Sequence, residues 1–230
     1  MRTADVVVIG GGIHGCSTAL HLALRGLKPI LVEKDYAGRH ASGVNAGGVR
    51  QLARDLAEIP LSIASMGLWE RIEDLVGDDC GFESHGTVLV AENEDELASF
   101  RARVDDLRLR GFTHEELIDR AELKRLVPAV ADHCPGGVVS RRDGAADPFR
   151  ATQAFRRRAV EKGAEVLEGV VVTGLSKIGA NWRVETSAGP IEAPKVVNAA
   201  GAWADRVAAM LGEPVPLTVV APMLMVTSRV

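Results

Sequence analysis

A glycine-rich turn close to the N-terminus constrains the fold of this chain more than any other feature. The apolar run Val6–Ile9 leads directly into residues 10–15, Gly-Gly-Gly-Ile-His-Gly, which match the pattern G-x-G-x-x-G. A helical stretch of small residues follows as far as Gly26, and a second apolar run, Pro29–Val32, ends at Glu33. This order of strand, turn, helix, strand and acid predicts a βαβ unit that binds a dinucleotide.

Each position of the motif has a physical role in such a site. Gly10 lets the chain turn tightly out of the strand, Gly12 lets a pyrophosphate approach the backbone, and Gly15 lets the helix pack closely on the strand. Free N–H groups and the positive dipole end of the helix then face the phosphates. The residues predicted to contact the dinucleotide in this unit are Gly10, Gly12, Ile13, His14, Gly15, Glu33 and Lys34.

Glu33 lies 18 residues after Gly15, where its carboxylate can accept hydrogen bonds from a ribose diol. An acid at this position favours a ribose without a 2′-phosphate, although Lys34 and Arg39 leave a phosphorylated ribose as the alternative. The motif alone does not distinguish NAD from FAD.

The composition argues against several other classes of protein. A net charge of −4 gives no basic surface for nucleic acid, so no nucleic-acid partner is expected. The cysteines, Cys16, Cys80 and Cys134, show no C-x-x-C spacing and predict neither a disulfide framework nor a zinc site. His14, Cys16 and His21 are close in sequence, but His14 falls at a variable position of the glycine motif and His21 on the following helix. No metal site is therefore expected.

The chain reaches its first predicted strand within five residues, which leaves no room for a signal peptide. No apolar run approaches the ~20 residues that a membrane-spanning helix needs. We therefore expect a cytoplasmic protein without a membrane span. At 230 residues, the chain has the length of one large domain or two small ones.

Residues 35–50 are rich in small side chains and end in the run Ala-Ser-Gly-Val-Asn-Ala-Gly-Gly-Val-Arg. Small side chains let the backbone approach a flat ligand, and Ser42 and Asn45 add hydrogen-bonding groups. A flexible linker and an ordinary loop are the alternatives. Neither explains small residues at this density directly before a helical pattern.

The βαβ motif, the terminal acid and the run 41–50 together resemble the D-amino-acid oxidase superfamily of FAD enzymes, which includes glycine oxidase, sarcosine oxidase and related dehydrogenases. The resemblance implies that this segment runs along the pyrophosphate and the ribityl chain towards the isoalloxazine ring. Some relatives attach FAD covalently through a histidine in it. Asn45 takes that position here, with His40 five residues earlier, so the resemblance gives no support for a covalent link. The implicated residues are Ser42, Asn45, Ala46, Gly47, Gly48 and Val49.

Arg50 and Arg54 are the only substrate-binding candidates. In the resembled family the position of Arg50 begins the next helix, and the four-residue spacing would place both side chains on one helix face. From there they would point at a substrate carboxylate, whereas a solvent-exposed face is the alternative. The sequence identifies no general base, and catalytic residues stay unassigned.

Residues 81–142 lack the βαβ regularity of the N-terminal part. One or two helices within residues 54–76, interrupted near Pro60, precede them. The block itself predicts a strand within 82–91, a helix from the N-cap Asn93 to Arg110, a helix over 119–127 and a strand over 136–140. We interpret it as an inserted mixed-sheet α+β substrate domain, whose strands form a roof over the flavin in the resembled family.

Asp147 and Pro148 mark the return to the first domain. An N-cap acid followed by proline at the first helical position is a strong helix start, and the helix is expected to run to Lys162. The resembled family has a similar Asp-Gly-x-x-Asp-Pro at this point. We assign Asp143 and Asp147 structural rather than catalytic roles.

Short β runs follow at 165–167, 170–172 and 182–186, and residues 195–203 form a second strand-to-helix turn of small residues. In the resembled family, backbone at the position of Val172 contacts the adenine, and the Ala-Gly-Ala-Trp turn lies against the diphosphate region. The resemblance therefore adds Val172, Ala200, Gly201 and Trp203 to the predicted site. A single NAD-binding domain would not need the second turn, so we expect FAD.

These features predict an α/β fold with two domains. Residues 1–80 and 143–212 form a Rossmann-like FAD-binding domain of the GR2 type, and 81–142 with 213–230 form an incomplete substrate domain. Residues 214–230 are apolar and resemble a further strand of that domain. Because the chain covers only the earlier part of the family pattern, we expect a missing C-terminal segment or a completing subunit.

The resemblance implies an FAD-dependent enzyme that oxidises the C–N bond of a small amino acid or secondary amine by hydride transfer to the flavin. Glycine, sarcosine, D-amino acids and proline derivatives are the expected substrate types. Two alternatives stay open. The same fold supports dehydrogenation of a hydroxy acid or glycerol phosphate, and the chain could instead be a non-catalytic nucleotide-binding subunit of a larger oxidase.

Overall fold

The computed structural model describes residues 1–220. The chain forms two units, each made of separate stretches of sequence. Unit 1 contains Met1–Ala46, Val76–Cys80 and the described chain from Asp147 onward, and unit 2 contains Gly47–Leu75 and Gly81–Ala146. Unit 2 thus begins earlier in the chain than the predicted substrate domain, and it includes Arg50 and Arg54. The assignment of a cofactor domain and a substrate domain stays a prediction.

Unit 1 is built on a four-stranded parallel sheet in the order β13-β2-β3-β9. The side chains of β2 and β3 are buried on both faces, as expected of a parallel sheet covered on both sides. This sheet confirms the predicted α/β class and the strands expected around the glycine turn. The strands are β13 (Lys195–Asn198), β2 (Val6–Ile9), β3 (Pro29–Val32) and β9 (Glu165–Leu167).

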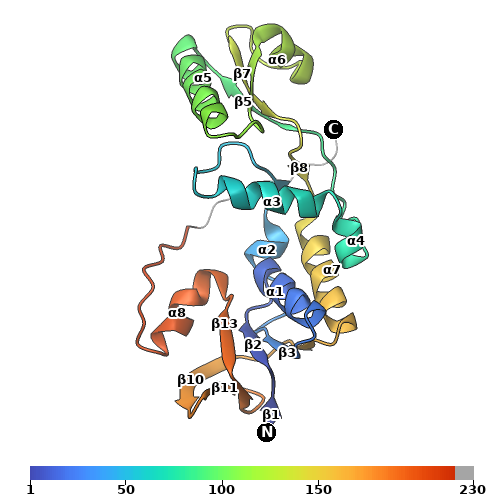
Figure 1. Cartoon of the computed structure of the whole chain (residues 1–230), viewed down its shortest axis with the longest axis vertical. Helices are drawn as coiled ribbons and strands as arrows, with labels where there is room; N and C mark the ends of the chain where they lie inside the picture. The colour runs from blue at the N-terminus through green and yellow to red at the C-terminus, as the bar shows by residue number, and fades with distance from the viewer. Residues whose placement is uncertain (221–230) are drawn as a thin grey trace. The chain divides into compact units, whose positions relative to one another are not determined.

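Two helices, α1 (Ile13–Leu24) and α7 (Pro148–Glu161), lie side by side and contact this sheet (Figure 1). The buried residues of α1 include Gly15, Cys16 and Ala19, whose small side chains let the helix approach the strands closely. The predicted start of α7 is confirmed, because the Asp147 carboxylate accepts a hydrogen bond from the Arg150 amide at 2.9 Å.

A second sheet and a short helix pack against the other face of the parallel sheet. Val7 and Ile9 of β2 belong to one buried cluster with Val184, Ile191 and Val207. Val8 points to the opposite face, towards α1, because successive strand residues alternate. The second sheet has the order β1 (Arg2–Thr3), β12 (Ile191–Ala193), β11 (Asn181–Thr186), β10 (Val172–Ile178), and Val207 belongs to α8 (Ala204–Ala209), which follows the 3-10 turn η1 (Gly201–Trp203).

Unit 2 is built on three antiparallel strands in the order β5-β7-β6. Alternation along the strands creates two apolar faces. Val139 of β7 packs with Leu123 of α6, whereas Val138 packs with Val104 of α5. The sheet is therefore covered by α6 on one face and by α5 on the other. The bounds are β5 (Thr87–Ala91), α5 (Glu94–Leu109), β6 (Glu116–Asp119), α6 (Arg120–Leu126) and β7 (Gly136–Ser140).

The remaining described elements are short connections. Unit 1 contains α2 (Ala41–Val44), and in unit 2 β4 (Gly48–Val49) pairs antiparallel with β8 (Gly144–Ala145). Two helices, α3 (Ile59–Trp69) and α4 (Ile72–Val76), follow β4.

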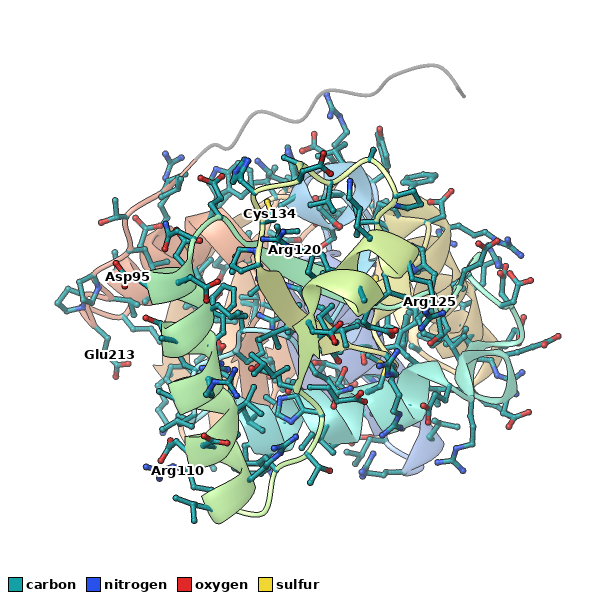
Figure 2. The ribbon with its side chains drawn as sticks, turned by 90° about the horizontal axis from the view of Figure 1, so that it is seen from above. Asp95, Arg110, Arg120, Arg125, Cys134 and Glu213 are labelled. Carbon is teal, nitrogen blue, oxygen red and sulfur yellow. The ribbon has the colours of Figure 1, made fainter. Side chains whose placement is uncertain are left out.

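α5 begins at the predicted capping residue. The Asn93 side chain accepts a hydrogen bond from the Glu96 amide at 2.9 Å, and the Glu96 carboxylate accepts one from the Glu92 amide at 2.9 Å. Figure 2 shows Asp95 and Arg110 at opposite ends of the helix. Acids at the N-terminal end and arginine at the C-terminal end are favourable for the helix dipole.

Four predictions of local structure are wrong. The β run expected at 170–172 is a strand only from Val172, where β10 begins. Arg50 does not begin a helix, because α3 starts at Ile59. Pro60 lies in the first turn of α3, where its missing N–H group is tolerated, and does not interrupt a longer helix. Residues 214–220 form no strand, and the rest of that predicted strand, 221–230, lies outside the described residues. The short strands β1, β4, β6, β8 and β12 were not predicted, nor was most of β10.

Within residues 1–220, no helix is both long enough and apolar enough to cross a membrane. The cytoplasmic location stays a prediction.

Candidate dinucleotide site

A pocket of about 610 Å³ lies at the carboxyl ends of the parallel strands of unit 1, and we call it the carboxyl-end pocket. Ile9 and Gly10 line it after β2, Val32 and Glu33 after β3, and Ala199 after β13. Its volume lies within the ~300–1,000 Å³ that is usual for small-molecule clefts. Ligands of open α/β sheets bind outside the carboxyl ends of the strands, so this is the expected position of a nucleotide site.

Close backbone contacts fix the glycine turn beside this pocket. Gly10 has a φ of +111°, and a Cβ on it would collide with the carbonyl oxygen of Ala199. A Cβ on Gly15 would collide with the carbonyl oxygen of Gly10. Side chains at either position would therefore separate the turn from α1 or from the end of β13, as the motif predicts.

Gly12 and Ser42 bring α1 and α2 together at the pocket. Ser42 Oγ accepts a hydrogen bond from the Ile13 amide at 3.0 Å, one of the N–H groups that have no partner within the helix. A Cβ on Gly12 would lie only 2.9 Å from Ser42 Oγ. The first turn of α1 thus directs backbone donors and the positive end of its dipole towards the pocket.

Glu33 is buried, with 7% of its surface exposed, although it lines the pocket. One carboxylate oxygen accepts a hydrogen bond from the Gly11 amide at 2.6 Å, and the other accepts one from the Asp35 amide at 2.9 Å. The carboxylate therefore links the glycine turn to the end of β3. Each oxygen has a second lone pair for a hydroxyl donor.

Trp203 forms an aromatic wall of the pocket. Lys34 Nζ lies 3.6 Å from the centroid of its indole ring, and the centroids of the Trp203 and His40 rings are 4.6 Å apart. The lining also includes Arg39 and Arg206. The 24 lining residues thus include three cationic side chains, those of Lys34 and the two arginines, and one acidic side chain, that of Glu33. This excess of positive charge favours an anionic ligand such as a pyrophosphate.

Glu33, Asp35 and His40 form the one group in the described chain that has metal-ligand atoms within 4.8 Å of one another. Hydrogen bonds account for their proximity. His40 Nε2 lies 2.7 Å from Asp35 Oδ2, and the Glu33 oxygens accept the two backbone amides described above. The predicted absence of a metal stays a prediction.

The structure brings ten of the predicted cofactor residues together at the carboxyl-end pocket. These are Gly10, Gly12, His14, Glu33, Lys34, Ser42, Val172, Ala200, Gly201 and Trp203. Ile13 and Gly15 lie in the first turn of α1, beside the lining residues. Asn45 follows α2, where its side chain donates to the Ala41 carbonyl oxygen at 2.9 Å. Ala46 ends that stretch of unit 1, and Gly47, Gly48 and Val49 lie in unit 2.

Sequence reasoning missed four residues that contribute to the site. Gly11 occupies a variable position of the motif, yet its amide donates to Glu33 and its Cβ would lie 2.9 Å from the Glu33 side chain. Arg39 and His40 belong to the segment of small residues and were not assigned to the site. Arg206 lies three residues after Trp203. Helical spacing after the second turn was the signal that could have identified it.

Arg50 and Arg54 lie in unit 2, apart from the lining of the carboxyl-end pocket. They share no helix, but the Arg54 Nε atom donates to the Arg50 carbonyl oxygen at 3.4 Å. Arg50 Nη1 lies 3.5 Å from the Leu52 carbonyl oxygen. Across residues 1–220, neither guanidinium forms an ion pair with a carboxylate.

The parallel sheet, the glycine turn and the acid at the end of β3 define a dinucleotide-binding α/β protein. Residues 5–230 match the family described as "DAO: FAD dependent oxidoreductase". The chain belongs to this family, whose cofactor is FAD. The resemblance to the D-amino-acid oxidase superfamily and the expectation of FAD are thereby confirmed.

Individual members of the family share substantial sequence with this chain. Mouse sarcosine dehydrogenase is 32% identical over 237 residues, which cover 99% of this chain. One subunit of the anaerobic glycerol-3-phosphate dehydrogenase of Escherichia coli K12 is 35% identical over 220 residues, or 90% of this chain. The crystal structure of L-proline dehydrogenase from P. horikoshii covers 92% of this chain with a TM-score of 0.85 and 32% identity.

The chain spans only part of each of these proteins. It covers 56% of the L-proline dehydrogenase chain, 26% of the mouse sarcosine dehydrogenase and 39% of the glycerol-3-phosphate dehydrogenase subunit.

Proposed function

We propose that this chain is part of an FAD-dependent oxidoreductase that oxidises the C–N bond of a small amino acid or secondary amine. The observation that carries the proposal is the carboxyl-end pocket, with the glycine turn, Glu33 and the second turn at Trp203 around one cavity. Family membership supports FAD as the ligand of that cavity. Sarcosine and proline, named in two of the relatives, are a secondary amine and a cyclic amino acid.

The residues of the pocket fit the parts of FAD. The amides of the first turn of α1 would bind the pyrophosphate, and Glu33 would accept hydrogen bonds from the ribose hydroxyls. Lys34 and Trp203 would flank the adenosine end, near the backbone of Val172. The turn at Ala200 and Gly201 would approach the diphosphate. When bound, the flavin supplies the hydride acceptor.

The segment from Ser42 to Val49 would continue along the cofactor. Ser42 already orients the first turn of α1 through its bond to the Ile13 amide. Asn45, Ala46, Gly47, Gly48 and Val49 would follow the ribityl chain. Arg50 and Arg54, which have no carboxylate partner in residues 1–220, would bind the carboxylate of an amino-acid substrate.

The visible absorption spectrum of the purified protein, before and after denaturation, tests the cofactor assignment. We expect flavin bands that stay in the supernatant after denatured protein is removed, because Asn45 replaces the histidine that some relatives link covalently. Bands in the precipitate would indicate a covalent bond, with His40 as the nearest candidate in sequence. No flavin after reconstitution with FAD would contradict the proposal.

Anaerobic reduction of the bound flavin tests the substrate class. Bleaching of the flavin band on addition of sarcosine, glycine, L-proline or D-amino acids is expected, within about a second at saturating substrate for a typical kcat of ~1–10³ s⁻¹. Glycerol 3-phosphate belongs in the same panel, because the 35% identity to the Escherichia coli subunit favours it as the second candidate. Bleaching by that compound alone would replace the amine proposal.

The short coverage of the relatives supports a third possibility, in which this chain is one part of a longer protein or of a multi-subunit oxidase. A non-catalytic nucleotide-binding subunit would retain flavin, but none of the amines, amino acids or glycerol 3-phosphate named above would reduce that flavin. Mass spectrometry of the natural protein and co-purification with a second chain would identify the remaining portion.

A further inference from the structure

We propose that Asp143 is a positioning residue that holds residues 50–54, here called the arginine segment, in the conformation that presents Arg50 and Arg54 to a carboxylate. The inference rests on the proposed function, because it gives these arginines a substrate to bind. All of the residues involved lie in unit 2. No catalytic step is assigned to Asp143 itself.

Asp143 is fully buried, and its carboxylate accepts three hydrogen bonds. One oxygen accepts the Gln51 amide and the Ser140 hydroxyl, each at 2.8 Å, and the other accepts the Leu52 amide at 3.0 Å. Two successive backbone amides are thus fixed by one carboxylate that lies 91 residues from Leu52 in the sequence. A buried carboxylate with this many donors is a strong local anchor.

Glu115, a second buried acid, fixes the next amide of the segment. Its Oε1 atom accepts the Ala53 amide at 2.9 Å, and both of its oxygens accept bonds from Arg103, at 2.7 Å and 2.8 Å. Arg103 Nη2 also donates to the Arg54 carbonyl oxygen at 2.8 Å. The arginine segment is therefore held at three successive N–H groups and at one carbonyl.

Leu52 and Ala53 show that the segment has an imposed conformation. The Leu52 side chain is 1% exposed and packs in the cluster of α5 and β7. Ala53 has a φ of +57°, a region that a non-glycine residue adopts only when its surroundings require it. Because these bonds prevent the backbone from forming a helix, Arg50 and Arg54 project from a fixed turn.

A carboxylate is required at position 143 because all three groups that face it are donors. An asparagine offers one acceptor oxygen, and its NH₂ group would oppose a backbone N–H group. Asp143→Asn should therefore release at least one of the two amides while keeping the side-chain volume. Asp147→Asn is the matched control, because Asp147 caps α7 in unit 1 and contacts no residue of the arginine segment.

The test combines hydrogen–deuterium exchange of the FAD-loaded protein with steady-state kinetics. We expect amide exchange at residues 51–53 to rise at least about tenfold in Asp143→Asn and to stay unchanged in Asp147→Asn. The KM for an amino-acid substrate should rise about tenfold with kcat within about twofold, since the loss concerns substrate orientation and not the flavin. Unchanged exchange, or faster exchange with an unchanged KM, would overturn the proposal.

Glu115→Gln keeps the test decisive if Asp143→Asn does not fold. It should accelerate exchange at Ala53 and raise KM in the same direction, and an unchanged KM in a folded Glu115→Gln protein overturns the proposal. Failure of the proposed function gives a different result, because then none of the tested amines reduces the flavin of the wild-type protein. Acetate then serves as the probe. A Kd for acetate about tenfold weaker in Asp143→Asn supports the positioning role, and equal values reject it.

Discussion

Gly15 and Gly67 are helical glycines in opposite situations. Gly15 faces the Gly10 carbonyl oxygen, whereas a Cβ on Gly67 in α3 would meet no atom within 4 Å. Gly15→Ala should displace α1 and abolish flavin binding. Gly67→Ala should stabilise the protein by roughly 0.5–1 kcal/mol, because alanine lowers the entropy lost on helix formation. Thermal unfolding and flavin absorbance measure both effects, and flavin retention in Gly15→Ala would contradict the assigned packing.

His114 makes stability depend on pH. Burial lowers the pKa of this imidazole from 6.5, although Glu115 and Asp143 oppose the shift, and neither ring nitrogen has a hydrogen-bond partner in the described chain. Below pH 6.5 the unfolded state therefore binds more protons than the folded state. The stabilisation is complete above pH 6.5 and is lost as the pH falls towards the lowered pKa.

Denaturant unfolding between pH 7 and pH 5 should thus show a falling free energy of unfolding. His114→Gln should flatten this dependence, whereas His133→Gln, at an exposed position, should leave it unchanged. Equal pH dependence in the wild type and in His114→Gln would show that His114 is not responsible.

The three cysteines are buried, and burial raises the pKa of Cys16 to about 12 and that of Cys80 to about 11. The reactive thiolate form is therefore scarce in the folded protein. Iodoacetamide at pH 8 should label the native protein slowly and the urea-unfolded protein at all three sites, as measured by intact-mass spectrometry. Rapid native labelling of Cys16 would mean that α1 opens readily from the parallel sheet.

At the scale of whole elements, α5 offers a direct test of capping. Asn93→Ala removes the acceptor for the Glu96 amide and should cost about 1 kcal/mol of stability. Asn93→Asp keeps an acceptor next to the positive end of the dipole and should preserve the stability of the wild type. Chemical denaturation separates the two. A loss of equal size in both variants would assign the effect to something other than the cap.

Elements whose signals are local were predictable from the sequence. The runs at 6–9 and 29–32 have both faces apolar, and α7 has an aspartate and a proline at its start. Each of these elements can therefore be recognised from a few consecutive residues. The arginine segment was mispredicted because its conformation depends on Asp143 and Glu115, which are distant in sequence. Three-residue β12 is too short for its alternation to be recognised, yet it completes the second sheet.

At the scale of the whole molecule, the candidate site collects residues from three parts of unit 1. The glycine turn and Glu33 carry a recognisable pattern, and Trp203 lies at a second turn of the same kind. Arg206 and Gly11 were missed because their roles follow from the packing of α8 and of the Glu33 carboxylate, for which sequence spacing gives only a weak signal. The sequence pattern thus predicted the residues that shape the pocket better than it predicted the charged side chains that line it.

FAD should stabilise unit 1 through this pocket. A ligand at 100 times its Kd adds about 2.7 kcal/mol to the stability of the state that binds it. Addition of FAD should therefore raise the Tm of the apoprotein and quench Trp203 fluorescence. Trp203→Phe should lose most of the quenching, because Trp69 and Trp182 do not line the pocket. An unchanged Tm at saturating FAD would argue against binding at the carboxyl-end pocket.

The pairing of β2 with β13 also bears on how the protein is made. Val6 of β2 pairs with Lys195 of β13, whereas β3, the other neighbour of β2, lies close behind it in the sequence. On the ribosome, β2 emerges long before β13, so one of its sides has no native neighbour until nearly the entire described chain has been synthesised. Until then, the apolar strand β2 keeps an unpaired edge and exposed side chains, and such surfaces are the ones that chaperones bind. Slower translation should prolong that exposure, and the yield of soluble protein should then depend more strongly on chaperone supply than on the stability of the finished fold.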